Sequence, residues 1–135
     1  MYLKNALTLS DAKAIAAAAE AEAVKNEWQV TIAVFDEGGH LLFLQRLDGA
    51  PLGSVAVAQE KARTALLFKR PSKAIEEAIA GGRVVMLTLP GATPIEGGLP
   101  LLNKGEIIGA IGVSGVQSSQ DGQIASAGVA AAEKL

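Results

Sequence analysis

The spacing of apolar and polar residues predicts four helices, the first of them close to the N-terminus. Between Leu9 and Ala23, small apolar residues recur every three or four positions, and the charged residues fall elsewhere on the helical wheel. Thr8 and Asp11 have the spacing of a capping box. The pattern therefore predicts a helix that begins after Thr8 and ends near Asn26.

Three further segments have helical spacing, and each begins at a serine that is able to cap a helix. One begins at Ser54 and ends at Arg70-Pro71, because proline stops a helix. A shorter one begins at Ser72 and ends at Gly81-Gly82. The last is rich in alanine and runs from Ser118 to the C-terminus.

Strands are predicted where apolar and β-branched residues lie between turn residues. Gln29–Phe35 and His40–Leu47 flank the turn sequence Asp-Glu-Gly-Gly, and together they predict a hairpin. Leu99–Leu102 and Ile107–Val113 flank a second turn and predict another hairpin.

The apolar run Val84–Leu89 is too short to assign from its period, and we expect a strand there. In chain order the segments are a helix, two strands, two helices, a strand, two strands and a helix. Local hairpins separated by helices favour an antiparallel sheet over parallel βαβ units, so we expect an α+β fold. No repeat or linker interrupts the sequence, and we expect one domain over residues 1–135.

The composition indicates that the chain associates with copies of itself. Hydrophobic residues make up 50% of the chain but aromatic residues only 4%, so alanine and glycine fill much of the core. Small side chains bury less apolar surface per residue than leucine or phenylalanine do. Because self-association adds burial, we expect a homo-oligomer.

Charge and cysteine content exclude several classes of function. The net charge is −2 with acids and bases interspersed, and aromatic residues are too few for a base-stacking platform, so we expect no nucleic-acid partner. Without cysteine there is no disulfide, thiolate metal site or cysteine nucleophile. No apolar run approaches the ~20 residues that span a bilayer. We expect a cytoplasmic protein without a membrane partner, although a signal peptide that had been removed would leave no trace.

The loop from Pro94 to Pro100 is the strongest candidate for a site. It holds Glu96 beside Gly97 and Gly98, which have no side chains to keep a ligand off the backbone. The two prolines restrict the loop, and a stiff loop beside a hairpin is a common position for a site. The alternative interpretation is a glycine-rich connector with one solvated glutamate.

Other polar residues are weaker candidates. His40, the only histidine, follows a Gly-Gly turn and is suited to act as a general base or axial ligand, or is simply a surface residue. Arg46 and Asp48 share a strand face and either meet a ligand or form an ordinary ion pair. Lys61 and Arg63 would suit ligand carboxylates or phosphates, or they lie on a solvated helix face. A zinc or iron site needs three or four ligands, which this chain does not supply in one pattern.

Five segments of the chain resemble the small GlcG/HbpS-like proteins, also described as haem-binding or haem-degrading. The segments occur in the family's order and cover nearly the whole chain: Val34–Leu41, Arg46–Pro51, Ala58–Ala65, Pro94–Pro100 and Gly109–Gly115. The resemblance implies a profilin-like α+β fold, with a central antiparallel sheet flanked by helices. It also implies homo-oligomers of up to octamers.

The same resemblance implies a small-molecule ligand. Some members bind haem and are linked to its breakdown or to iron and redox sensing, and others accompany enzymes of glycolate or diol use. If haem binds here, His40 is the only imidazole for the iron, with Met86 or Tyr2 as weak substitutes. Arg46 or Lys61 would then pair with the propionates.

Three functions stay open at this level, and whether the protein is an enzyme stays open with them. The first is a haem-binding oligomer that stores, senses or degrades haem. The second is an enzyme for a small organic acid, with Glu96 as acid/base and Gly97, Gly98 and Arg46 or Lys61 holding the anion. The third is a non-catalytic sensor or assembly module. For either kind of site we expect Glu96, Arg46 and His40 to meet in a cavity between subunits.

Overall fold

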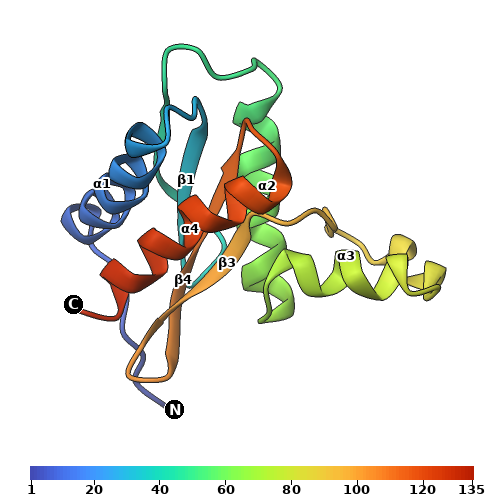
Figure 1. Ribbon diagram of the computed structural model, residues 1–135. Coiled ribbons are helices and arrows are strands. Elements are labelled where there is room, and N and C mark those ends of the chain that lie inside the picture. Colours follow the sequence, from blue (N-terminus) through green and yellow to red (C-terminus); the bar gives the residue numbers. More distant parts are fainter.

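The two predicted hairpins form one four-stranded antiparallel sheet in the computed structural model, which describes residues 1–135 (Figure 1). The strands are β1 (Thr31–Asp36), β2 (Leu41–Arg46), β3 (Gly98–Asn103) and β4 (Glu106–Ser114), in the order β2-β1-β4-β3. The central strands β1 and β4 are almost entirely buried, which explains their continuous apolar sequences. The predicted α+β fold is confirmed.

Helices cover both faces of this sheet. Helices α1 (Leu9–Lys25) and α4 (Ser118–Ala132) pack against each other on one face, and α2 (Ser54–Phe68) covers the other (Figure 1). The core under α2 consists largely of alanine. A Cβ added at Gly112 of β4 would overlap the carbonyl oxygen of Ala58, so α2 lies directly on the backbone of the sheet. Small residues therefore determine how closely the layers approach.

A helical arm projects from this body (Figure 1). It contains α3 (Ser72–Ala80) and the short 3-10 helix η1 (Val84–Thr88). The strand predicted at Val84–Leu89 is therefore wrong. The turn at Gly81-Gly82 folds this segment back against α3, where no neighbouring strand is present to complete a ladder of hydrogen bonds.

The helix boundaries are predicted better than the caps. The capping box of Thr8 and Asp11 is confirmed, and α1 ends beside Asn26. The serine caps are wrong, because the cap positions are occupied by Gly53, Pro71 and Gln117. The hydroxyls of Ser54 and Ser72 form tertiary hydrogen bonds instead, and Gln117 forms its own capping box with Gln120. The longest helix has 17 residues, and none combines the length and hydropathy needed to cross a bilayer.

Candidate functional site

The glycines of the Pro94–Pro100 loop pack against α2 and β4. A Cβ at Gly97, where φ is +133°, would lie 2.6 Å from the carbonyl oxygen of Val113 and 2.9 Å from Nζ of Lys61. The amide of Gly98 donates to Oγ of Ser72 at 2.9 Å. A Cβ at Gly98 would overlap the carbonyl oxygen of Lys61, so packing against the protein itself is sufficient to require glycine at both positions.

Lys61 lies beneath this loop in a buried ion pair. Its side chain is 2% exposed, and its Nζ donates to Oδ2 of Asp121 and to the carbonyl oxygen of Val113, each at 3.0 Å. The interpretation of Lys61 as part of a solvated helix face is therefore wrong. Burial raises the pKa of Asp121. The charge of Lys61 and the hydrogen bonds that the carboxylate accepts both oppose that rise. Because this ammonium already has two protein partners, a ligand role for Lys61 stays a prediction.

Glu96 lies beside the first turns of α4 and the arm. Its carboxylate is close enough to α4 that a Cβ at Gly122 would lie 2.6 Å from Oε2. Nζ of Lys73 is 3.9 Å from the same oxygen, and the backbone amide of Glu96 donates to Oε1 of Glu76 at 3.1 Å. A carboxylate near the N-terminal end of a helix is electrostatically favourable. The side chain is 18% exposed, so it is largely enclosed by these neighbours.

His40 and Arg46 lie at opposite ends of β2, with His40 just before the strand and Arg46 at its last position. At ~3.3 Å per residue this separates them by about 20 Å. Both are exposed. Glu96 precedes β3, which is the opposite edge of the sheet from β2. Within one subunit the three residues do not meet, and their meeting across a subunit boundary stays a prediction.

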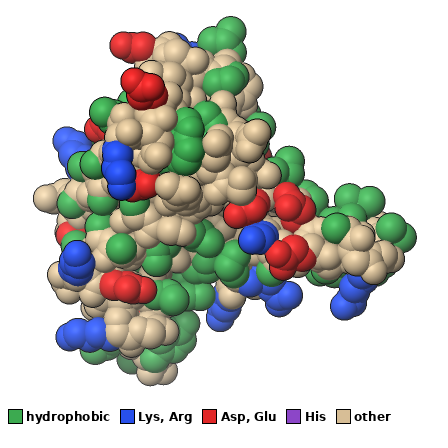
Figure 2. Space-filling view, viewed as in Figure 1, with side chains coloured by type: hydrophobic (Ala, Val, Ile, Leu, Met, Phe, Trp, Pro, Cys, Tyr) green, Lys and Arg blue, Asp and Glu red, His purple; other side chains and the backbone are tan.

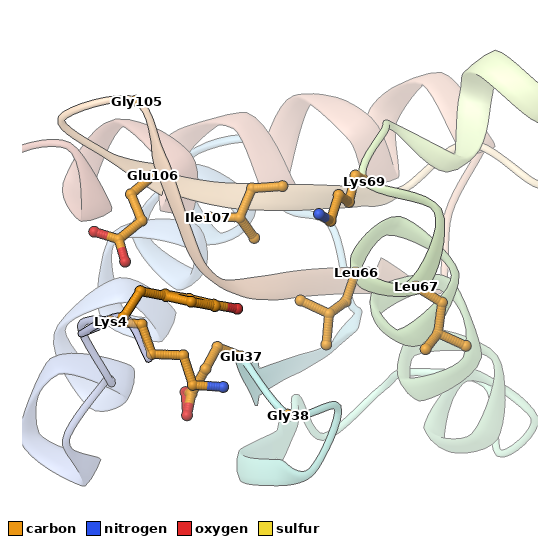
Figure 3. Close-up of a pocket in the computed structure, with 10 residues that line it drawn as sticks. Lys4, Glu37, Gly38, Leu66, Leu67, Lys69, Gly105, Glu106 and Ile107 are labelled. Carbon is orange, nitrogen blue, oxygen red and sulfur yellow. The ribbon is translucent and has the colours of Figure 1, made fainter.

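A groove of about 520 Å³ opens beside the turn that carries His40 (Figure 3). The N-terminal segment, the β1–β2 turn, the end of α2 and the β3–β4 turn contribute to its wall. Leu66 and Ile107 point into it, and Lys4 and Lys69 approach from opposite sides (Figure 3). The groove thus combines apolar surface with two ammonium groups.

His40 lies at the rim of this groove. A Cβ added at Gly38, which lines the groove, would come within 3.2 Å of Nδ1 of His40. The imidazole is 82% exposed, and its Nδ1 is 3.6 Å from Oδ1 of Asp36. Asp36 also accepts from the amides of Gly38 and His40, which fixes the turn. The turn therefore places an exposed imidazole next to Gly38 of the groove, although His40 itself does not line the wall.

The carboxylates of the groove differ in their hydrogen bonding. Both oxygens of Glu106 accept from Asn5, at 3.2 Å from its amide nitrogen and 3.1 Å from Nδ2. Glu37 has a buried Oε2 without a hydrogen-bond partner. Neither Lys4 nor Lys69 forms an ion pair in the protein. The two ammonium groups at this groove are therefore available to a ligand.

Sequence reasoning missed Lys4 and Lys69 because no local pattern joins them. They are 65 positions apart and face the same groove from opposite sides only in the folded chain. Lys69 ends α2 in a left-handed conformation, with φ at +52°, which the sequence does not indicate. No group of three or more histidine, cysteine, aspartate or glutamate residues is arranged to hold a metal ion by itself.

The sheet order and the helices on both faces define a class of small α+β domain that is seen in solved structures. Klebsiella pneumoniae protein ORFY superposes with a TM-score of 0.91 and 31% sequence identity, over 100% of this chain and 96% of that one. The structure described as the PduOC:Heme complex superposes with a TM-score of 0.83 and 28% identity, over 94% and 95% of the two chains.

Sequence comparison identifies the family. Residues 7–130 match the family described as "Haem degrading protein HbpS-like". Protein GlcG of Escherichia coli K12 is 48% identical over 114 residues, which are 84% of this chain and 85% of GlcG. The chain belongs to the HbpS-like family, as its resemblance to GlcG/HbpS-like proteins predicts.

Proposed function

We propose that this protein binds haem in the groove beside the β1–β2 turn, with His40 as an axial ligand of the iron. One observation carries the proposal: the only imidazole of the chain stands exposed at the rim of a groove of about 520 Å³ with apolar and cationic walls. The family description and the haem complex of a structural relative support it.

The residues of the groove fit the chemistry of haem. Leu66 and Ile107 offer apolar surface to the porphyrin, and the unpaired ammonium groups of Lys4 and Lys69 suit its two propionates. These lysines replace Arg46 and Lys61 in this role, because Arg46 lies at the far end of β2 and Lys61 is buried in its ion pair. Bound haem would supply an iron centre for electron transfer or oxygen chemistry.

Titration of the purified protein with hemin, followed at the Soret band, tests this proposal. We expect a saturable red shift for the wild type and a loss of about tenfold or more in affinity for His40→Ala. Arg46→Ala is the matched control on the same strand, and we expect it to bind like the wild type. A His40→Ala variant with unchanged affinity and spectrum would overturn the assignment of the axial ligand.

The lysines provide a second, independent test. Lys69→Glu reverses a charge that is exposed and outside the core, so folding is preserved and hemin affinity falls. The loss should shrink at high salt, because exposed charges are screened. Lys25→Glu is the matched control, since Lys25 is an exposed lysine at the end of α1. Equal hemin affinities for the two variants would place the propionates elsewhere.

The proposal includes self-association and a cytoplasmic location, as the sequence predicts. It leaves storage, sensing and degradation to be separated by experiment: loss of the Soret band on incubation with ascorbate and oxygen indicates degradation.

The alternative with Glu96 as acid/base has less support, because Gly98 already donates its amide to Ser72. Full activity of a Glu96→Gln variant on any substrate that is found would dismiss that role.

A further inference from the structure

A second hollow, of about 400 Å³, opens at the end of the β1–β2 hairpin opposite the proposed haem groove. The end of α1, the segment before β1 and the turn after β2 form its wall, through Val24, Glu27, Trp28, Gln29, Leu47 and Asp48. The haem groove lies at the β1–β2 turn, so the full length of both strands separates the two sites. The hollow therefore has no part in the proposed function.

Trp28, the only tryptophan of the chain, is fixed beside Glu27 at the end of α1. The amide of Trp28 donates to the carbonyl oxygen of Ala23 at 2.9 Å, and the amide of Glu27 donates to that of Val24 at 3.0 Å. These two bonds end the helix in the pattern that usually places glycine at the position of Glu27, whose φ is +59°. The indole packs against the core and also lines the hollow. An acidic residue thus stands next to a half-buried indole.

Asp48 is held at the same hollow by the turn that follows β2. The amide of Leu47 donates to the carbonyl oxygen of Val30 at 2.9 Å, and the amide of Ala50 donates to that of Leu47 at 3.0 Å. The first bond ties this segment to the start of β1, and the second closes a turn around Asp48. Asp48 is exposed and forms no ion pair in the subunit, so its carboxylate is free to meet a ligand.

The electrostatic character of the hollow is negative. Glu27 is likewise exposed and without an ion pair. The C-terminal end of α1, a helix of 17 residues, adds a partial negative charge. Acidic side chains stand over this end of the molecule in Figure 2, and most basic side chains in that view lie farther down. Two carboxylates and a helix end thus favour a cationic ligand.

The basic residues nearest in sequence are directed elsewhere. Lys25 reaches back toward Glu22, with 3.8 Å between Nζ and Oε1. Arg46 is paired across the strands with Thr31, whose hydroxyl meets Ser54 of α2, so Arg46 lies on the face of the sheet that α2 covers. The hollow lies beside α1, which packs on the opposite face (Figure 1). The two carboxylates of the hollow therefore keep their charge uncompensated.

The apolar part of the wall narrows the class of cation. A metal ion needs several oxygen ligands, and no group of three or more carboxylate or imidazole residues converges here. Val24 is 62% exposed and Leu47 is half-buried, and such surface suits methyl groups better than the hydration shell of a metal ion. The face of an indole attracts an alkylated ammonium ion through its ring quadrupole. A cation that carries its own apolar surface fits all of these groups.

We propose that this hollow binds a small alkylated ammonium ion, with the cation over the indole of Trp28 and the carboxylates of Glu27 and Asp48 as its counter-charges. A volume of about 400 Å³ is within the range of small-molecule sites. Binding of this cation is independent of haem binding, so its absence would leave the proposed function untouched.

The fluorescence of Trp28 reports on this site without a label, because the chain has no second tryptophan. We expect choline, added at constant ionic strength, to change the emission along a saturable curve. The matched control is the uncharged carbon analogue of choline, in which a tert-butyl group replaces the trimethylammonium group, and we expect it to bind about tenfold more weakly or less. Equal responses to the two compounds, or a response to choline that does not saturate, would overturn the proposal.

Substitution of the carboxylates separates binding from stability. Glu27→Gly removes one counter-charge and places glycine at a left-handed position, so we expect the urea midpoint to stay or rise while choline affinity falls about threefold or more. Asp48→Asn should weaken choline binding to a similar extent. Glu133→Gln, at an exposed position at the end of α4, is the matched control and should bind like the wild type. Unchanged affinity in both hollow variants, or an equal loss in the control, would contradict the proposal.

Discussion

Lys61 and Asp121 join three elements at one buried point. Their ion pair links α2 to the first turn of α4, while Nζ of Lys61 also bonds the end of β4 and Oδ1 of Asp121 accepts from the amide of Val116. Removing two charges from water is costly, and only the complete set of partners offsets that cost. The pair therefore holds the glycine-rich loop in position above it.

Removing one partner of this pair should be strongly destabilising. Lys61→Met leaves the carboxylate of Asp121 buried without a counter-charge, and we expect a loss of about 3–5 kcal/mol in the free energy of unfolding at neutral pH. Combining it with Asp121→Asn removes the orphaned charge and keeps the acceptor for Val116, so the double variant should lose less than the sum of the two single variants. Urea unfolding measures all three, and simple additivity would contradict a coupled pair.

The raised pKa of Asp121 predicts a pH dependence with a definite sign. In the unfolded chain this carboxyl titrates near its ordinary pKa of 3.8, and in the folded protein its pKa is higher because of burial. Between those two values the native state binds more protons, so the contribution of Asp121 to stability is lost as the pH rises through the folded pKa. Subtracting the curve of Asp121→Asn isolates this term, and we expect the difference to fall with rising pH above 3.8. A difference that rises with pH would contradict burial as the dominant cause.

At the scale of elements, contact between backbones determines how α2 lies on the sheet. A side chain at Gly112 would overlap the carbonyl oxygen of Ala58, so the absence of one at this position allows α2 to lie this close to β4. The alanines of α2 repeat this requirement along the helix. The position of α2 in turn determines where Leu66 and Lys69 stand at the groove.

Enlarging that contact should separate the two layers. Gly112→Ala forces α2 away from β4, and we expect a loss of about 1–3 kcal/mol or more in the free energy of unfolding. Gly53→Ala is the control, because a Cβ at Gly53 meets no atom within 4 Å. Thermal unfolding followed by circular dichroism compares the two variants. Equal midpoints would show that the helix is free to shift.

The sequence contained enough local information for the helices and hairpins. Apolar runs on either side of turn residues predicted both hairpins, and the capping box at Thr8 predicted the start of α1. The run Val84–Leu89 was ambiguous because a short apolar segment suits a strand or an uncovered helical turn equally well. Ser54 and Ser72 were misassigned because their hydroxyls bond to residues distant in sequence.

At the scale of the whole molecule, the groove could not be predicted because four distant segments form it. The sequence singled out His40, but Lys4 and Lys69 became candidates only once the fold placed the N-terminal segment and the end of α2 on opposite sides of one groove. The same folding removed Lys61 from solvent, since a lysine within a helix gives no local sign of a buried carboxylate partner. The family resemblance thus indicates a kind of ligand, which stays a prediction, whereas the residues proposed to bind it could be named only from the fold.

The location of the iron tests the proposed function most directly. Crystals of the hemin complex, measured at the iron absorption edge, give an anomalous peak that marks the metal without reference to the porphyrin density. We predict one peak per groove within bonding distance of the His40 imidazole, with the porphyrin over Leu66 and Ile107 and its propionates toward Lys4 and Lys69. An iron peak beside Glu96, or anywhere remote from His40, would contradict the proposed site.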